Sequence, residues 1–245
     1  MDIFYDFGRY GRLLYQAIRS STEVKSYYRN FVSEMIKTGY ESLPIVMLAG
    51  LFTGAVLTIQ TSYQLISALI PKSTIGAIVS QSIIIELAAV ISGLILAGRV
   101  GARIATELGT MRVSEQIDAL ESMGFNSVSF LVVPRVLAGF VMFPVLWVAA
   151  ATCGIGGGVL AGWISGSVPA ADFMQGAREF FFAWDIIFGL TKAVVFGFII
   201  TSISCFKGYY ATGGAEGVGN ATTNAAVLSC IYILLADLVL AAVLL

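Results

Sequence analysis

The chain has 245 residues, of which 58% are hydrophobic and only 12% are charged. A soluble domain carries about 25% charged residues, so this composition excludes an ordinary soluble protein and indicates an integral membrane protein. The net charge of −1 provides no basic surface for nucleic acid, and the absence of histidine removes the commonest general base and metal ligand.

Residues 1–42 form an N-terminal segment that mixes charged with aromatic residues. Its apolar side chains recur at spacings of three and four, which places them on one face of a helix. These side chains are Phe4, Phe7, Tyr10, Leu14 and Ile18. Because arginines flank this face, the pattern predicts an amphipathic helix in the membrane interface. The alternative is a cytoplasmic helix that packs on a partner.

Residues 43–245 form a five-span domain. Five apolar segments reach the roughly 20 residues that a membrane-crossing helix needs. They extend approximately over residues 43–70, 75–98, 128–165, 180–206 and 224–245. The predicted fold class is therefore an all-α integral membrane protein, with one interfacial helix followed by five transmembrane helices.

The basic residues indicate the orientation of these spans. Of the 14 Lys and Arg residues, all except Lys72, Arg178 and the intramembrane Lys192 lie on the side of the N-terminus. Basic residues concentrate on the cytoplasmic side of membrane proteins. We therefore expect a cytoplasmic N-terminus and, after five spans, a C-terminus on the outer side.

The segment GTMRVSEQIDALESMG, residues 109–124, lies between the second and third spans and is unusually polar. Ser114 is expected as the N-cap, Glu115 falls in the first turn, and Gly124 is expected to end the helix. The pattern predicts a short cytoplasmic helix at about residues 110–123.

This predicted helix has two distinct faces. Val113, Ile117, Leu120 and Gly124 lie on one face, whereas Glu115, Asp118 and Glu121 lie on another. Such a segment is too short and too charged to cross a membrane, yet it is regularly patterned. The pattern favours a docking helix over a simple connector.

Three ionisable residues fall inside predicted spans: Glu86, Lys192 and Asp237. Each costs about 2.5–3.5 kcal/mol near the membrane centre, so each is a candidate that faces a cavity or a partner. The alternative is a purely structural ion pair among them. Cys153, Cys205 and Cys230 stand singly without metal-ligand spacing, so neither a catalytic site nor a metal site is expected.

The glycine-rich segment at residues 205–225 separates the last two spans and contains Lys207 and Glu216. It lacks the phosphate-binding pattern G-x-x-x-x-G-K-[ST], and no strand precedes it. A cytoplasmic hairpin is expected instead, with Thr222 or Thr223 near the start of the last helix. If ATP drives this protein, another subunit must hold it.

Small residues recur at every fourth position in two spans. One series is Gly154, Gly158, Gly162 and Gly166, and the other is Ala89, Gly93, Ala97, Gly101, Ala105 and Gly109. Such stripes allow helix backbones to approach closely within lipid. They favour a tightly packed bundle and have no chemical role.

Two long segments carry specific motifs. AGRVGARIATELGTMRVSEQIDALESMG covers residues 97–124, and FKGYYATGGAEGVGNATTNAAV covers residues 206–227. Shorter pieces agree with them, such as VPRVLAGFVMFPVL at residues 133–146. From about residue 40 onward, the chain resembles the MlaE family, the permease subunits of MCE-type lipid ABC transporters.

The resemblance implies a homodimer of permeases with a lipid cavity at the dimer interface. Two cytoplasmic ABC ATPase subunits, which hold ATP and Mg, would bind it, and an MCE-domain protein would lie on the outer face. The complex would lie in a bacterial inner membrane and would move phospholipid or a similar lipid between membranes. The chain itself would be a transport subunit without a cofactor, not an enzyme.

The segment at residues 109–124 resembles the coupling helix of the family, which lies in a groove of the ATPase. By this resemblance, the residues at the ATPase contact are Arg112, Glu115, Gln116, Asp118 and Glu121. Charged residues suit such a position because the contact is a hydrated protein interface and not lipid.

The chain differs from the family beside Glu86. Many members carry Arg directly before this glutamate and Pro three residues after it, whereas this chain has Ile85 and Ala89. Without that arginine, Lys192 is expected to meet a lipid phosphate, in preference to a carboxylate of Glu86 or Asp237.

Two other hypotheses remain at this point. A proton-coupled secondary carrier of a lipophilic solute would use Glu86 and Asp237, and a structural scaffold would use neither. The absence of histidine and the pattern of a coupling helix favour the ABC permease.

Overall fold

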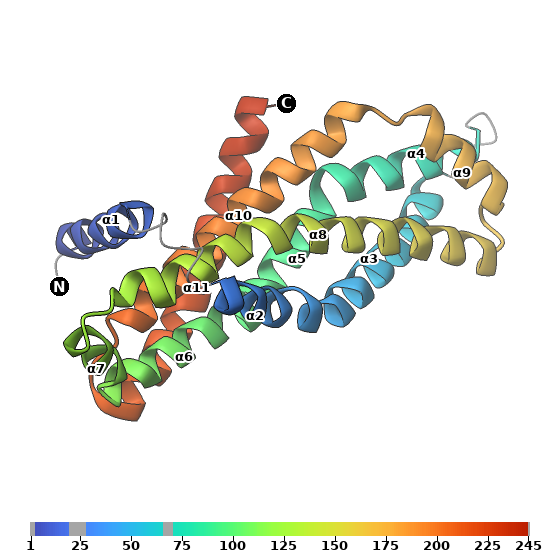
Figure 1. Cartoon of the computed structure of the whole chain (residues 1–245). Coiled ribbons are helices and arrows are strands. Elements are labelled where there is room, and N and C mark those ends of the chain that lie inside the picture. The colour runs from blue at the N-terminus through green and yellow to red at the C-terminus, as the bar shows by residue number, and fades with distance from the viewer. Residues whose placement is uncertain (1–2, 20–27, 66–70, 245) are drawn as a thin grey trace. The chain divides into compact units, whose positions relative to one another are not determined.

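The computed structural model describes residues 3–19, 28–65 and 71–244, and every regular element in these ranges is a helix (Figure 1). Three parts of the prediction lie outside the described residues. They are Lys25, Leu245 and residues 66–70, where the first span was predicted to end. Also outside them are the side chains of Phe4, Phe7 and Ile18, which belong to the predicted amphipathic face.

Five helical stretches are long and apolar enough to cross a membrane, which confirms the predicted number of spans. They are Tyr28–Gln64, Ser73–Val113, Ser127–Ile164, Ala183–Tyr209 and Gly214–Leu244. The first, second and fifth extend well beyond the predicted apolar segments. Hydropathy marks the part of a helix that suits lipid, whereas backbone hydrogen bonds continue the helix into polar sequence.

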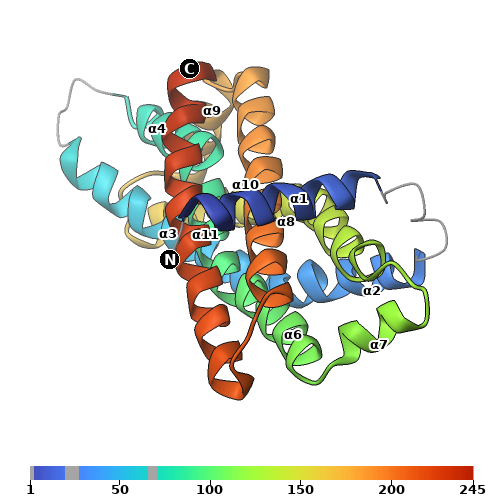
Figure 2. The same cartoon turned by 90° about the vertical axis from the view of Figure 1, so that its left-hand side faces the viewer.

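The N-terminal segment contains α1 (Ile3–Arg19), α2 (Tyr28–Thr38) and the short 3-10 helix η2 (Tyr40–Ser42). In α1, Leu13 is fully buried. The Tyr10 hydroxyl forms a 2.8 Å hydrogen bond with Ser202 of α10 (Ala183–Tyr209), and its ring lies edge-on to Phe206. Helix α1 therefore lies across α10 (Figure 2). Its placement in a membrane interface stays a prediction.

The second span is a continuous series of helical segments with two π-helical turns. The α-helical parts are α4 (Ser73–Ser82), α5 (Ala88–Leu96) and α6 (Ala102–Val113). The π-helical parts are η3 (Ile83–Leu87) and η4 (Ala97–Gly101). A π turn adds a residue to the helical repeat and so rotates the side chains that follow. Periodicity alone did not predict these turns.

The described chain divides into two compact units, each built from three stretches of sequence. The first unit comprises Met1–Glu41, Leu94–Met142 and Val194–Ala236. The second comprises Ser42–Gly93, Phe143–Ala193 and Asp237–Leu245. The core of the first unit includes Ile104, Leu108 and Ile200, and that of the second includes Val79, Leu146 and Phe188.

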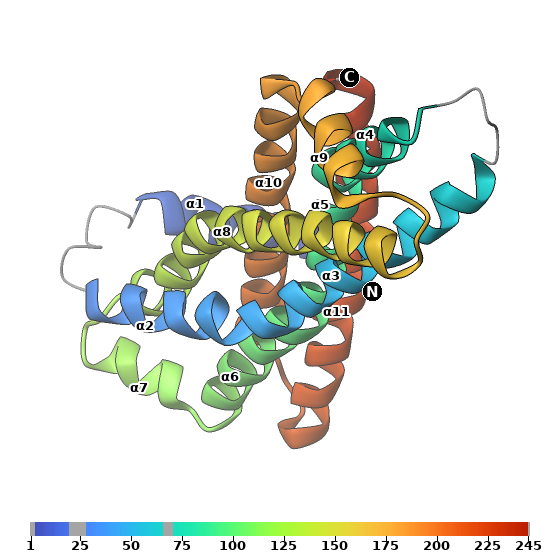
Figure 3. The ribbon, with the colours of Figure 1, turned by 90° about the vertical axis from the view of Figure 1, so that its right-hand side faces the viewer.

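Glycine brings two helices of the second unit together. Helix α3 (Leu43–Gln64) runs beside the glycine-rich half of α8 (Ser127–Ile164), as Figure 3 shows. A Cβ atom on Gly54 would lie only 1.8 Å from the carbonyl oxygen of Gly154. This contact supports a packing role for Gly154, whereas Gly166, the last glycine of the predicted stripe, lies beyond the end of α8 and has nothing within 4 Å of its Cβ position.

The sequence analysis missed α9 (Ala170–Glu179), which lies beside α4 in the second unit (Figures 1 and 3). A Cβ atom on Gly76 would lie 2.2 Å from the carbonyl oxygen of Phe173, and one on Gly176 would lie 1.8 Å from that of Ser73. Reciprocal glycines thus allow the two backbones to touch. With only 10 residues, α9 was too short to stand out by hydropathy.

The last helix, α11 (Gly214–Leu244), begins ten residues before the predicted start at residue 224. Gly213 and Gly214 have φ values of 98° and 66° and form the turn after α10. Thr222 and Thr223 therefore lie inside the helix, and the prediction that one of them marks its start is wrong. The turn needs left-handed backbone conformations, and glycine adopts them most readily.

Candidate functional site

The three intramembrane charges meet in the second unit. Lys192 of α10 donates a 2.6 Å hydrogen bond to Oε2 of Glu86, which belongs to the π turn η3. Its Nζ atom also lies 2.7 Å from Oδ1 of Asp237 on α11. The contact with Asp237 is an ion pair without hydrogen-bond geometry. One ammonium group thus joins three helical elements, and we call these three residues the charge triad.

The members of the charge triad differ in accessibility. The Lys192 side chain is 0% exposed, that of Asp237 is 16% exposed, and that of Glu86 is 39% exposed. The Lys192 ammonium also lies 4.6 Å from the centre of the Phe188 ring. A buried cation needs such partners, because an isolated charge in a medium of low polarity is very unfavourable.

The triad decides between the alternatives for Lys192. The expected lipid phosphate would need an accessible ammonium group, whereas Lys192 is fully enclosed and paired with both carboxylates. The preference for a lipid partner of Lys192 is therefore wrong at the level of direct contact. Lys192 thus gives Glu86 a basic partner although the arginine before Glu86 is absent.

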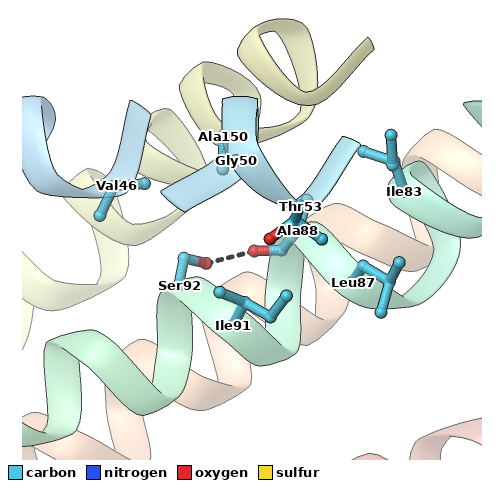
Figure 4. Close-up of a pocket in the computed structure, with 9 residues that line it drawn as sticks. All are labelled: Val46, Gly50, Thr53, Ile83, Leu87, Ala88, Ile91, Ser92 and Ala150. Carbon is cyan, nitrogen blue, oxygen red and sulfur yellow. Dashed lines mark hydrogen bonds between the residues drawn. The ribbon is translucent and has the colours of Figure 1, made fainter. Parts of the chain in front are cut away.

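A small cavity lies elsewhere in the second unit, between α3, the segment η3–α5 and α8 (Figure 4). Its volume is about 10 Å³, and apolar side chains such as Val46, Ile83 and Leu87 dominate its lining. The hydroxyl of Ser92 donates to the carbonyl group of Ala88, so it is not free for a ligand. This cavity is too small for a lipid chain.

The polar segment after the second span lies in the first unit and forms two helical parts separated by a turn. Helix α6 continues to Val113, and a separate helix α7 covers only Gln116–Ser122. The single helix predicted at about residues 110–123 is therefore divided. Glu115 precedes α7 with a left-handed φ of 59°.

The helix ends of α7 were predicted with unequal success. Ser114 is not the N-cap, because its hydroxyl donates back to the carbonyl oxygen of Thr110 at 2.7 Å. Gly124 does end the helix: its φ is 83° and its amide donates to Glu121. The amide of Phe125 donates to Leu120, which completes the double hydrogen bond expected when glycine ends a helix.

The predicted contact residues of α7 fall into three groups. Glu115 and Gln116 are exposed, and Gln116 donates a 3.0 Å hydrogen bond to the hydroxyl of its neighbour Ser114. Arg112 and Asp118 form a 2.6 Å ion pair with each other. Glu121 turns toward the chain itself and accepts hydrogen bonds from Ser127 and Tyr209.

The buried face of α7 is narrower than predicted. Ile117 is fully buried and anchors the helix. Val113 is the last residue of α6, not a residue of α7, and is 39% exposed. Lys207 and Glu216 were predicted in the last loop, but both lie in helices. Lys207 is in the last turn of α10, with its Nζ atom 5.3 Å from the centre of the Phe206 ring, and Glu216 is exposed in the first turn of α11.

The family model for Permease MlaE matches residues 31–243. The chain belongs to the MlaE permease family. It is 40% identical over 230 residues to a probable ABC transporter permease protein of Rickettsia bellii, which covers 94% of this chain and 88% of that protein. The family and the five candidate spans together make the chain an ABC transporter permease and a multi-pass membrane protein.

Two further relatives of this MlaE-family permease have informative names. The intermembrane phospholipid transport system permease protein MlaE of Haemophilus influenzae is 32% identical over 246 residues, or 99% of this chain and 93% of that protein. The chloroplastic protein TRIGALACTOSYLDIACYLGLYCEROL 1 of Arabidopsis thaliana is 37% identical over 216 residues, or 88% and 61% of the two chains.

This MlaE-family permease also contains a charge cluster that the sequence analysis missed. It lies in the first unit and consists of Glu34, Lys37, Arg103, Glu107 and Arg135. Each cation lies within 3.1–3.9 Å of both carboxylates. The residues come from α2, α6 and α8. The spacings Glu34–Lys37 and Arg103–Glu107 were the available signal.

Proposed function

We propose that the chain is the permease subunit of an ATP-driven transporter that moves phospholipid or a similar lipid between membranes. The observation that carries this proposal is the nearly full-length match to the Haemophilus influenzae permease, whose name states intermembrane phospholipid transport. The match to the Permease MlaE family over residues 31–243 supports the same scaffold.

The proposed orientation follows from the basic residues. With the N-terminus in the cytoplasm of a bacterial inner membrane, nearly all Lys and Arg residues outside the bilayer lie on the cytoplasmic side. Helix α7 then faces the cytoplasm, because it lies between the second and third spans. The C-terminal end of α11 lies on the outer side.

The proposed ATPase contact is centred on the start of α7. Glu115 and Gln116 are exposed there, while Ile117 holds the helix against its own unit. A partner that binds this surface would move α7 together with α6. ATP and Mg would be held by that partner, a cytoplasmic ABC ATPase.

In this proposal the lipid cavity forms between two copies of the chain. The small cavity beside α3 measures about 10 Å³, which is far below the volume of an acyl chain. Helix α11 presents a long row of exposed apolar side chains, among them Leu234, Leu238 and Val243, to lipid or to another subunit. In this proposal an MCE-domain protein covers the outer face of the dimer and receives or delivers the lipid.

The test is a lipid-transfer assay in proteoliposomes. The permease would be purified with the ATPase that binds it, and the transfer of fluorescent phospholipid to acceptor vesicles would be followed with and without ATP. ATP-dependent transfer supports the proposal. Transfer driven by a proton gradient in the absence of ATP would contradict it and favour the alternative carrier, in which Glu86 and Asp237 exchange protons.

A further inference from the structure

An open pocket of about 640 Å³ lies in the first unit beside the charge cluster. Lys37, Arg103 and Arg135 all line it, together with the threonines Thr106 and Thr110. Lys37 lies in the first part of span one, Arg103 in the last part of span two, and Arg135 in the first part of span three. Because successive spans cross in opposite directions, these positions lie at one membrane surface.

The charge cluster carries an excess of positive charge. It contains three cations, Lys37, Arg103 and Arg135, but only two carboxylates, Glu34 and Glu107. With all five groups ionised, one positive charge has no counter-charge within the cluster. A group with a single negative charge would balance it.

Several donors of the cluster are also unsatisfied. Of its six ion pairs, only that between Arg135 Nη2 and Glu107 Oε2, at 3.1 Å, is also a hydrogen bond. The remaining five separations are 3.4–3.9 Å. Arg135 Nε, Arg103 Nη1 and the carboxylate oxygen Glu34 Oε2 are buried without a hydrogen-bond partner among the described residues. Buried donors of this kind normally have a partner. Because these atoms are enclosed, a ligand in the open pocket would contact the side chains of Lys37 and Arg103, which are 39% and 23% exposed.

We infer that this pocket binds a singly charged phosphate group, and that its source is the headgroup of an anionic phospholipid. Guanidinium groups match phosphate oxygens in geometry, and the threonine hydroxyls add neutral donors. Basic pockets between membrane helices at the cytoplasmic surface are suited to anionic headgroups. The pocket lies in the first unit, whereas the charge triad belongs to the second.

The test measures lipid bound to the purified full-length protein by native mass spectrometry. The probes are dioleoylphosphatidylglycerol, dioleoylglycerol without a phosphate, and inorganic phosphate. Lys37 is the residue to change, because its side chain is 39% exposed and its loss spares the buried guanidinium groups. Loss of one basic group at a membrane surface should weaken phosphatidylglycerol binding about fivefold in Lys37→Gln.

The matched control is Lys72→Gln, an exposed lysine in the loop after the first span. It should bind phosphatidylglycerol like the unchanged protein, and dioleoylglycerol should bind all three proteins equally weakly. Equal affinity of the unchanged protein and Lys37→Gln for phosphatidylglycerol would overturn the inference. Binding of inorganic phosphate that depends on Lys37 and displaces no lipid would overturn the assignment to a headgroup.

Discussion

Lys192 shows how a single residue can hold three helical elements inside a membrane. Its ammonium group lies 2.6 Å from Glu86 and 2.7 Å from Asp237, and its side chain is fully buried. Two carboxylates around one cation make the loss of the cation more serious than the loss of either anion. Removing one partner of a buried pair leaves an uncompensated charge, whereas removing all partners together can be nearly neutral.

Lys192→Met should therefore lower the free energy of unfolding by about 3–5 kcal/mol, since methionine keeps much of the volume but leaves two carboxylates unpaired. The lower end is expected, because the Glu86 side chain is 39% exposed and therefore depends less on Lys192 than a fully buried carboxylate would. Chemical unfolding in detergent measures this difference.

A triple variant separates the loss of charge pairing from the loss of packing. Adding Glu86→Gln and Asp237→Asn to Lys192→Met should restore most of the lost stability. Lys72→Met serves as the control, because that lysine is exposed. A Lys192→Met protein as stable as this control would contradict the structural role of the charge triad.

At the scale of elements, α3 and α8 depend on glycine for their close approach. Gly54→Ala would place a methyl group 1.8 Å from the carbonyl oxygen of Gly154, so the helices must separate. We expect a loss of about 1–3 kcal/mol in the free energy of unfolding, as for other overpacked sites. Gly156→Ala in α8 is the matched control, since nothing lies within 4 Å of its Cβ position. That variant should be neutral or more stable, and equal destabilisation by both would refute the packing argument.

The contact between α1 and α10 should depend on pH through Tyr10. Burial raises the pKa of the Tyr10 hydroxyl above its ordinary value of 10.0, although the hydrogen bond with Ser202 acts in the opposite direction. Because the folded-state pKa is the higher one, the contact keeps its full stability below pH 10.0 and loses it as the pH rises through the folded pKa.

Protease protection of α1 measures this dependence. Protection should be constant at neutral pH and should fall in the alkaline range, whereas Tyr10→Phe should remove the alkaline loss. At neutral pH the same variant should cost about 0.5–1.5 kcal/mol for the missing hydrogen bond. An identical alkaline loss in Tyr10→Phe would show that another group causes it.

The elements also show which features the sequence could predict. The five spans follow from hydropathy, because a membrane-crossing helix must be apolar along most of its length. The π turn that contains Glu86 and the short helix α9 depend instead on tertiary packing, such as the reciprocal contacts of Gly76 and Gly176. The π turn leaves no periodic signal, and α9 is too short to stand out by hydropathy.

The candidate sites, like the helices, could be predicted only where they did not depend on tertiary packing. Glu86, Lys192 and Asp237 were each identified by their charge within an apolar span, but their pairing depends on how three distant segments pack. Glu34 and Arg135 were missed because charges near span ends usually face water, whereas both are largely buried here. Glu121 resembled its neighbours on the charged face of α7, yet it bonds Ser127 and Tyr209 of its own chain.

At the scale of the whole molecule, a permease must transmit the movement of its partner to its spans. Among the predicted contact residues, Glu115 and Gln116 are exposed at the start of α7, whereas Arg112 and Asp118 pair with each other and Glu121 bonds to its own chain. Substitutions at Glu115 and Gln116 therefore change the charge of the exposed surface without breaking an ion pair among the described residues.

The double variant Glu115→Lys and Gln116→Lys should insert and fold normally but should bind the ATPase at least about tenfold more weakly. The change reverses the charge of Glu115 and adds a positive charge at Gln116, which an interface of complementary charge disfavours. Lipid transfer should fall in parallel. Co-purification from detergent and the proteoliposome assay measure the two effects.

Glu179→Lys is the control: it reverses the charge of an exposed acidic residue on α9, on the opposite side of the membrane in the proposed orientation, and should leave ATPase binding intact. Normal transfer by the double variant at normal protein levels would exclude the start of α7 as the coupling surface, whereas weak binding by both variants would indicate a general effect of added positive charge.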